Sequence, residues 1–198
     1  LITIFNHFFG EDASFIWVGL CGYGIVKIDK QTQKVYSTPL TKTSLRPGIN
    51  VAYHGFIENG KLWIVDNNES GKPVFLRYDI KSGKTDTLPI AITNIVNLND
   101  SEALGVNASS ALLINKKTLA YTLIPITENV AEHNIVDIHP FSANEVILRS
   151  ATQRIYFLDT HTKKITRHIA VTDPENSKSS LNASCTYRDR SGNIWVGT

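Results

Sequence analysis

The 198-residue sequence contains no methionine and only two cysteines. Its net charge is +2, and its 20 lysines and arginines are scattered along the chain, which argues against a nucleic-acid-binding surface. The longest apolar runs, such as residues 111–114, are far too short to cross a bilayer, and no signal peptide is evident. The composition, 42% hydrophobic and 19% charged, is that of an ordinary globular protein of one good-sized domain.

A short apolar motif centred on tryptophan recurs along the chain. Residues 16–19 read Ile-Trp-Val-Gly and return as 194–197, while residues 62–65 read Leu-Trp-Ile-Val. Weaker copies occupy residues 103–106 and 146–149. The spacings are 46, 41, 43 and 48 residues when the copies are aligned on Trp17, Trp63, Leu104, Ile147 and Trp195. A period of about 40–50 residues built from short strands is typical of β-propeller blades.

Each repeat divides into four short apolar segments separated by turn residues. The pair Asn59-Gly60 is a strong hairpin signal between the first two segments of its repeat, and no stretch shows a sustained helical period. The sequence therefore predicts an all-β fold, namely a β-propeller fragment of four four-stranded blades plus half of a fifth. Within one partial propeller over residues 1–198, the blades are expected at residues 1–39, 49–90, 91–125, 134–170 and, incomplete, 181–198.

Residues 16–18 are apolar in succession rather than in alternation, so both faces of this strand need cover. A propeller supplies that cover because each blade lies between two neighbours. We therefore expect all three tryptophans to be core residues between blades: Trp17, Trp63 and Trp195. Gly19 and Gly197 would allow close backbone approach after two of them. Cys21 and Cys185 fall at non-equivalent places in the repeats, so we expect two free thiols rather than a disulfide.

The last repeat carries the most specific pattern. Residues 187–198 read Tyr-Arg-Asp-Arg-Ser-Gly-Asn-Ile-Trp-Val-Gly-Thr. This segment closely resembles the two-component regulator propeller repeat, which runs Asp-x-x-Gly-x-Leu/Ile-Trp-Ile/Val-Gly-Thr. The matching positions are Asp189, Gly192, Trp195 and Gly197.

Two further blades share parts of that pattern. The first blade matches through Glu11, Trp17 and Gly19, although Leu20 replaces the threonine. The second blade retains the turn glycine and Trp63 but lacks the Gly-Thr pair. The third and fourth blades share only length and hydrophobic pattern with the repeat.

Such repeats are typical of the sensor regions of hybrid two-component systems in carbohydrate-degrading gut bacteria. The resemblance implies two seven-bladed propellers, a small β-sandwich, a membrane helix, a histidine kinase and a DNA-binding regulator in the full-length protein. The propellers would lie in the periplasm and sense glycan fragments. Because the sequence starts without methionine and stops directly after a repeat motif, we expect it to be an excised piece of one larger, seven-bladed propeller.

The resemblance also implies the partners of this chain. We expect it to be the ligand-sensing extracytoplasmic part of an inner-membrane protein, to detect oligosaccharides derived from polysaccharides and to form a homodimer through the full-length sensor. It would reach the membrane only through segments outside this sequence and would not itself touch nucleic acid. The segment would not be an enzyme, since the kinase activity belongs to another part of the protein.

Catalytic patterns are missing from the sequence. The six histidines show no paired ligand spacing, and neither a nucleophile elbow nor a phosphate-binding loop is present. We therefore expect no catalytic residue, no metal and no cofactor. His7 and His54 fall on strands expected to line the central channel, where each would either bind a ligand or find a backbone partner.

Candidate ligand contacts lie in the loops of the face that propellers usually use for binding. Aromatic, amide, carboxylate and guanidinium groups there suit sugar hydroxyls, because they offer stacking and directed hydrogen bonds. For each residue the alternative is a solvated loop side chain. The candidates are Tyr23, Arg46, Asn67, Glu69 and His133.

Two other functions stay open at this point. A propeller lyase or lactonase would need histidine, glutamate or metal ligands that converge on the binding face. A protein-interaction scaffold would need a large exposed apolar patch, whereas the loops here are polar.

Overall fold

The computed structural model describes residues 5–20, 24–38, 54–67, 72–126, 135–151, 154–170, 185–189 and 191–197. All regular secondary structure in these residues is β-strand, numbered β1 to β18. The chain divides into two compact units, Leu1–Ile95 and Val96–Thr198. The prediction of an all-β architecture is confirmed.

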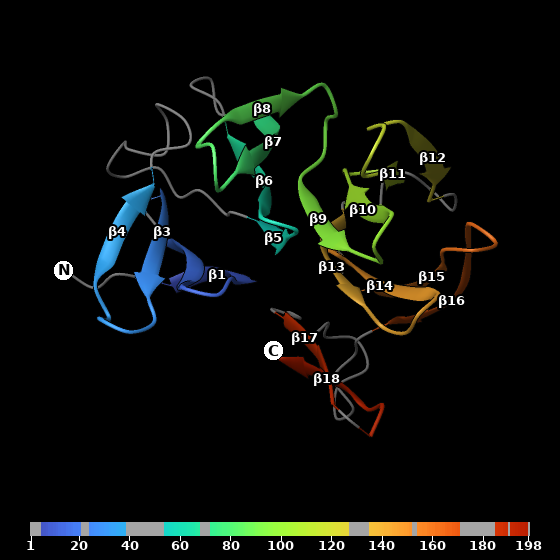
Figure 1. Cartoon of the computed structure of the whole chain (residues 1–198). Coiled ribbons are helices and arrows are strands. Elements are labelled where there is room, and N and C mark those ends of the chain that lie inside the picture. The colour runs from blue at the N-terminus through green and yellow to red at the C-terminus, as the bar shows by residue number, and fades with distance from the viewer. Residues whose placement is uncertain are drawn as a thin grey trace. The chain divides into compact units, whose positions relative to one another are not determined.

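The first unit contains two four-stranded antiparallel sheets (Figure 1), in which the strands lie in chain order. The first sheet consists of β1 (Phe5–Glu11), β2 (Phe15–Leu20), β3 (Gly24–Asp29) and β4 (Val35–Thr38). The second consists of β5 (His54–Glu58), β6 (Lys61–Asn67), β7 (Pro73–Asp79) and β8 (Thr85–Leu88).

The second unit holds most of the third sheet, a fourth sheet and a two-stranded pair, again with strands in chain order. The third sheet consists of β9 (Asn94–Asn97), β10 (Glu102–Val106), β11 (Ser110–Asn115) and β12 (Tyr121–Pro125). The fourth consists of β13 (Ile135–Pro140), β14 (Glu145–Ser150), β15 (Arg154–Asp159) and β16 (Lys164–Ala170). The pair consists of β17 (Cys185–Arg188) and β18 (Ile194–Gly197).

The second strand of the fourth sheet buries both of its faces, as its run of apolar residues predicts. Ile147 and Leu148 are adjacent on β14 and therefore point to opposite faces of the sheet. Leu148 belongs to a core that includes Leu104 of the third sheet. Ile147 belongs to a different core, against which Ile194 and Val196 of β18 pack. Each face of the strand is thus covered by a different neighbouring sheet.

The same rule holds between the two sheets of the first unit. Trp17 is 1% exposed and forms a core with Leu62 and Ile64 of β6, and its ring centre lies 6.3 Å from that of Tyr78. Val18, the next residue on β2, is buried on the opposite face. Because truncating a buried tryptophan typically costs about 3–5 kcal/mol, this contact is a major link between the two sheets.

The prediction that all three tryptophans are core residues is right for two of them. Trp17 and Trp63 are buried, but Trp195 is 62% exposed. Within the described residues, β18 is the last strand, and no further sheet covers the face that corresponds to the buried face of Trp17. The other face of β18 does pack, through Ile194 and Val196. Trp195 is therefore exposed because no sheet among the described residues packs on its face of β18.

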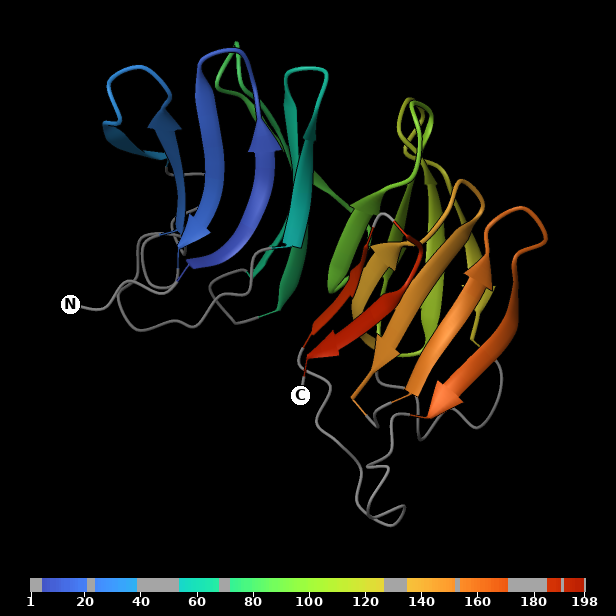
Figure 2. The same cartoon turned by 90° about the horizontal axis from the view of Figure 1, so that it is seen from below.

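Glycine allows the first strands of the two sheets in the first unit, β1 and β5, to lie side by side (Figure 2). A Cβ atom at Gly10 of β1 would overlap the side chain of Ile57 on β5. A second close approach lies within the second sheet, where a Cβ atom at Gly55 would overlap the carbonyl oxygen of Trp63. The second overlap is the more serious, because the Trp63 oxygen is backbone of the paired strand β6 and cannot rotate away.

We predict that Gly55→Ala destabilises the protein by about 1–3 kcal/mol, the usual range for overpacking a tight site. Urea unfolding would measure the change. The matched control is Gly60→Asn in the adjacent hairpin turn, where an added Cβ meets no atom within 4 Å and the backbone φ of 70° is one that asparagine tolerates. Equal losses in both variants would contradict the close-approach explanation.

The turns between third and fourth strands repeat one device in all four sheets. An Asp or Asn at the end of the third strand accepts, through its side-chain oxygen, the backbone N–H of the third residue after it. These residues are Asp29, Asp79, Asn115 and Asp159. The residue directly after that N–H donor has a φ between 57° and 70° in each turn. These residues are Gln33, Gly83, Leu119 and Lys163. Only one of the four is glycine, so the other three turns carry backbone strain.

Opposite substitutions at two of these turns should have opposite effects. Gln33→Gly relieves the left-handed strain at an exposed position and should raise the free energy of unfolding by up to about 1 kcal/mol, while Gly83→Ala should lower it by about 1 kcal/mol. Thermal unfolding of both variants is the measurement. A loss of stability in Gln33→Gly would show that its side chain contributes more than its backbone costs.

Candidate functional site

The loop residues singled out from the sequence are not tested by the structure. Tyr23, Arg46, Glu69 and His133 lie outside the described residues. Asn67 is the last residue of β6, and only its backbone is described. These five residues stay predicted ligand contacts. The described residues contain two other polar arrangements, one in the turns before the tryptophans and one on the first strands of the sheets.

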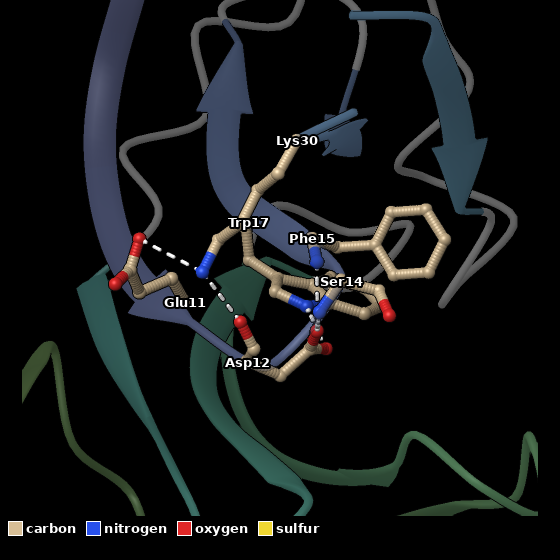
Figure 3. A network of polar contacts seen from close by, with 6 residues as sticks. All are labelled: Glu11, Asp12, Ser14, Phe15, Trp17 and Lys30. Atoms are coloured by element: carbon tan, nitrogen blue, oxygen red, sulfur yellow. Dashed lines mark hydrogen bonds and ion pairs between the residues drawn. The ribbon is translucent and has the colours of Figure 1, made fainter. Parts of the chain in front are cut away.

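The turn between β1 and β2 is organised by one carboxylate (Figure 3). Asp12 Oδ1 accepts the backbone N–H groups of Ser14 at 2.8 Å and Phe15 at 2.7 Å, and Oδ2 accepts the indole N–H of Trp17 at 2.8 Å. Lys30 Nζ donates to the Asp12 carbonyl oxygen at 2.6 Å and forms an ion pair with Glu11 at 3.2 Å. The same carboxylate thus fixes the turn and also orients the buried indole of Trp17.

The same device recurs before β18. Asp189 Oδ1 accepts the backbone N–H groups of Ser191 and Asn193, both at 2.9 Å, while Oδ2 accepts the indole N–H of Trp195 at 2.9 Å. Gly192 occupies the turn with a φ of 88°, a backbone conformation that favours glycine. Asp189, Gly192 and Trp195 therefore act as one structural unit.

This comparison corrects the alignment of the first repeat. The sequence pattern matched Glu11 to the aspartate of the repeat, but the structure gives that role to Asp12, which makes the contacts that Asp189 makes. The third sheet supplies a third example, in which Asn99 Oδ1 accepts the N–H groups of Ser101 and Glu102 at 2.9 Å. Leu104 replaces the tryptophan there, so no indole requires the second acceptor and an amide suffices.

Hydrogen bonding stabilises the charged form of both aspartates. For Asp12, burial is the largest influence and raises the pKa. The hydrogen bonds from Trp17, Phe15 and Ser14 and the charge of Lys30 lower the pKa. Together they outweigh the effect of burial, so that the pKa falls below the ordinary 3.8. For Asp189 the side-chain hydrogen bonds from Asn193 and then Trp195 lower the pKa to about 2.

A polar position also recurs on the first strands of three sheets. In each case the polar residue is the cross-strand partner of a residue on the second strand. That second-strand residue comes two positions after Trp17, Trp63 or Ile147. In β1 and β13 a register shift, the mark of a β-bulge, immediately precedes it, and bulges re-aim side chains. The residues there are His7 opposite Gly19, His54 opposite Val65 and Asp137 opposite Arg149.

In the first unit this position links the two sheets. The ring centres of His7 and His54 are 5.5 Å apart, and His7 Nε2 lies 3.0 Å from the Gly55 carbonyl oxygen. Because a carbonyl only accepts, Nε2 of His7 carries the proton in this contact. His7 thus has the backbone partner that was one of its two expected roles.

In the second unit the same position begins a charged cluster. His139 Nε2 lies 2.9 Å from Asp137 Oδ2, and Arg149 Nη2 lies 3.5 Å from the same oxygen. The side chain of His139 is 41% exposed, while those of Asp137 and Arg149 are 15% and 14% exposed. Sequence reasoning missed this cluster because Asp137 and Arg149 meet only through strand pairing across a bulge.

Several aromatic rings on the sheets already hold a cation over one face. Such a pair is stabilised by the charge of the cation and the electron-rich ring, and that ring face is then closed to a stacking sugar. The pairs, with ring-centre distances, are Lys27 over Phe15 at 4.5 Å, Arg77 over Trp63 at 5.5 Å and Arg167 over Phe157 at 3.8 Å.

Within the described residues, no three His, Cys, Asp or Glu side chains are grouped so that they could hold a metal ion. No helix in that part of the chain is long and apolar enough to span a membrane.

Residues 177–198 match the two component regulator propeller family. The chain carries this repeat at its last turn and strand. The match contains Asp189, Gly192 and Trp195, the residues that the structure joins by hydrogen bonds. The resemblance drawn from the sequence is therefore confirmed. No curated protein matches the chain by sequence.

Several solved structures share the fold. The extracellular domain of a hybrid two-component system from B. thetaiotaomicron aligns over 98% of this chain with a TM-score of 0.65 and 13% identity. The Swd1 β-propeller domain from Myceliophteria thermophila aligns over 98% of this chain with the same score and identity. BamB from Moraxella catarrhalis aligns over 80% of this chain with a TM-score of 0.55 and 13% identity.

These likenesses show the fold, and the four four-stranded sheets are blades of a β-propeller. The chain spans only part of each similar structure, namely 27% of the two-component extracellular domain, 64% of the Swd1 domain and 48% of BamB. The predicted propeller-fragment fold is therefore confirmed.

The aspartate of the first repeat should make stability depend on pH. Because the pKa of Asp12 is lower in the folded than in the unfolded chain, its charge stabilises the fold above the ordinary 3.8, and this contribution is lost as the pH falls through the lowered value. We predict that Asp12→Asn lowers the free energy of unfolding at pH 7 by about 1–2 kcal/mol and makes its fall as the pH drops below about 5 shallower. Urea unfolding at a series of pH values is the measurement.

Trp17→Phe is the matched control, since it keeps an aromatic ring but removes the indole donor. It should make the pH dependence only partly shallower, because the backbone of Ser14 and Phe15 still donates to Asp12. If Asp12→Asn kept the full wild-type pH dependence, the carboxylate would not be a source of it.

Proposed function

We propose that this chain is part of the ligand-sensing extracytoplasmic propeller of a hybrid two-component sensor, and that its ligand is an oligosaccharide derived from a polysaccharide. The match of residues 177–198 to the two component regulator propeller family carries the proposal. The likeness to the extracellular domain of a hybrid two-component system supports it, because both have the propeller fold.

The proposal extends to the rest of the protein. A histidine kinase would lie in another part of the full-length chain, the propeller would face the periplasm, and the sensor would work as a homodimer. The segment itself would bind without chemistry. The two aspartate-centred turns fit that role, because the carboxylates of Asp12 and Asp189 accept turn and indole N–H groups.

The physical requirement on such a sensor is differential affinity. A ligand shifts the equilibrium between two arrangements of the dimer only if it binds one of them more tightly than the other. Blades joined by apolar faces transmit such a bias well, since close-packed interfaces change between discrete arrangements rather than deform continuously.

A thermal-shift experiment tests the proposed function. The whole extracellular region that contains this chain should show a saturable rise in Tm with one class of polysaccharide-derived oligosaccharide, because a ligand that binds only the folded state stabilises it. At a hundredfold excess over Kd the added stability is about 2.7 kcal/mol. A folded protein whose Tm is unchanged by every glycan of a broad panel would contradict oligosaccharide sensing.

A further inference from the structure

We propose that Asp137, His139 and Arg149 on the fourth blade bind the hydroxyl groups of a neutral sugar residue. The inference rests on the proposed function and assigns it a site in the described residues. The cluster lies on β13 and β14, on the same strand face as Ile147, and not in the loops that the sequence favoured.

The geometry of the cluster is suited to a diol. Asp137 Oδ2 is shared by His139 Nε2 at 2.9 Å and Arg149 Nη2 at 3.5 Å. When the imidazole is neutral, donation from Nε2 to the carboxylate leaves Nδ1 as an acceptor. The three side chains therefore combine carboxylate and imidazole acceptors with guanidinium donors, as adjacent hydroxyls that both donate and accept require.

The apolar surroundings of the cluster indicate that its charged groups have a role besides packing. Along the strand pairing, His139 is opposite Ile147 and Arg149 is opposite Ile155, both of which belong to the apolar core that faces β18. Placing an ion pair beside an apolar face costs desolvation energy that apolar residues of similar size would avoid. A ligand that uses these charges is a physical reason for their presence there.

Exposure gives the ligand a route to the cluster. Asp137 and Arg149 are largely covered, so they are held in place, whereas His139 is 41% exposed and forms the accessible edge. Asp137 and Arg149 form an ion pair that carries no net charge, so the pair itself gives no preference for an acidic sugar. This balance favours a neutral sugar over a uronate or a sulfated sugar.

The experiment uses the whole extracellular region that contains this chain, with neutral oligosaccharides of the gluco, xylo, manno and galacto series and with oligogalacturonate as the acidic comparison. Calorimetric titration measures Kd for each. We expect one neutral series to bind, and Asp137→Asn and His139→Ala each to weaken that binding about tenfold or more, as loss of a charge-assisted hydrogen bond would.

His168→Ala is the matched control. His168 lies on β16, the outer strand of the same blade, where its ring packs 5.9 Å from that of Tyr156, and its loss should leave Kd unchanged. If Asp137→Asn does not fold, His139→Gln at the accessible edge replaces it, read together with the imidazole NMR signals of wild-type His139, which should shift on adding the sugar.

The outcomes separate the two proposals. Wild-type affinity in Asp137→Asn and His139→Ala would overturn the site, and the cluster would be a structural ion pair, while oligosaccharide sensing would stand. Binding of oligogalacturonate alone would overturn the assignment to a neutral sugar. No binding of any sugar by the folded wild type would overturn both proposals.

Discussion

The structure depends on the burial of each blade between its neighbours. A second strand such as β14 sends Leu148 into one core and Ile147 into another, so neither face is left to water. Trp17 shows the same constraint in the first unit, where it is covered by Leu62 and Ile64 of the next blade. Trp195, which no sheet among the described residues covers, is 62% exposed, although its turn is formed in the same way as that of Trp17.

Polar side chains in the turns satisfy the N–H groups at the edges of the apolar cores. The carboxylates of Asp12 and Asp189 each accept turn N–H groups and an indole N–H. At Asp12 this lets the buried Trp17 lie between blades without an unpaired donor. In the third blade Leu104 replaces the tryptophan, and the amide of Asn99 replaces the carboxylate in the turn. Turn chemistry and core composition are therefore linked within each repeat.

The first strands of three blades share one polar position. Their position opposite β2, β6 or β14 holds His7, His54 or Asp137, while the apolar residues on the next strand keep the blade together. On the fourth blade this position begins the cluster of Asp137, His139 and Arg149, which we propose as the sugar site.

The sequence alone determined the blade architecture, because spacing of the tryptophan motif and runs of apolar residues reflect local strand geometry and burial on two faces. It also determined the family resemblance, since the last turn and strand form one hydrogen-bonded unit of residues close in sequence. Only the tertiary structure showed that Asp12 rather than Glu11 holds the indole, because both precede the turn and only the fold decides which carboxylate points inward. Likewise, Asp137 and Arg149 are twelve residues apart and meet through strand pairing after a bulge, a register that no local pattern specifies.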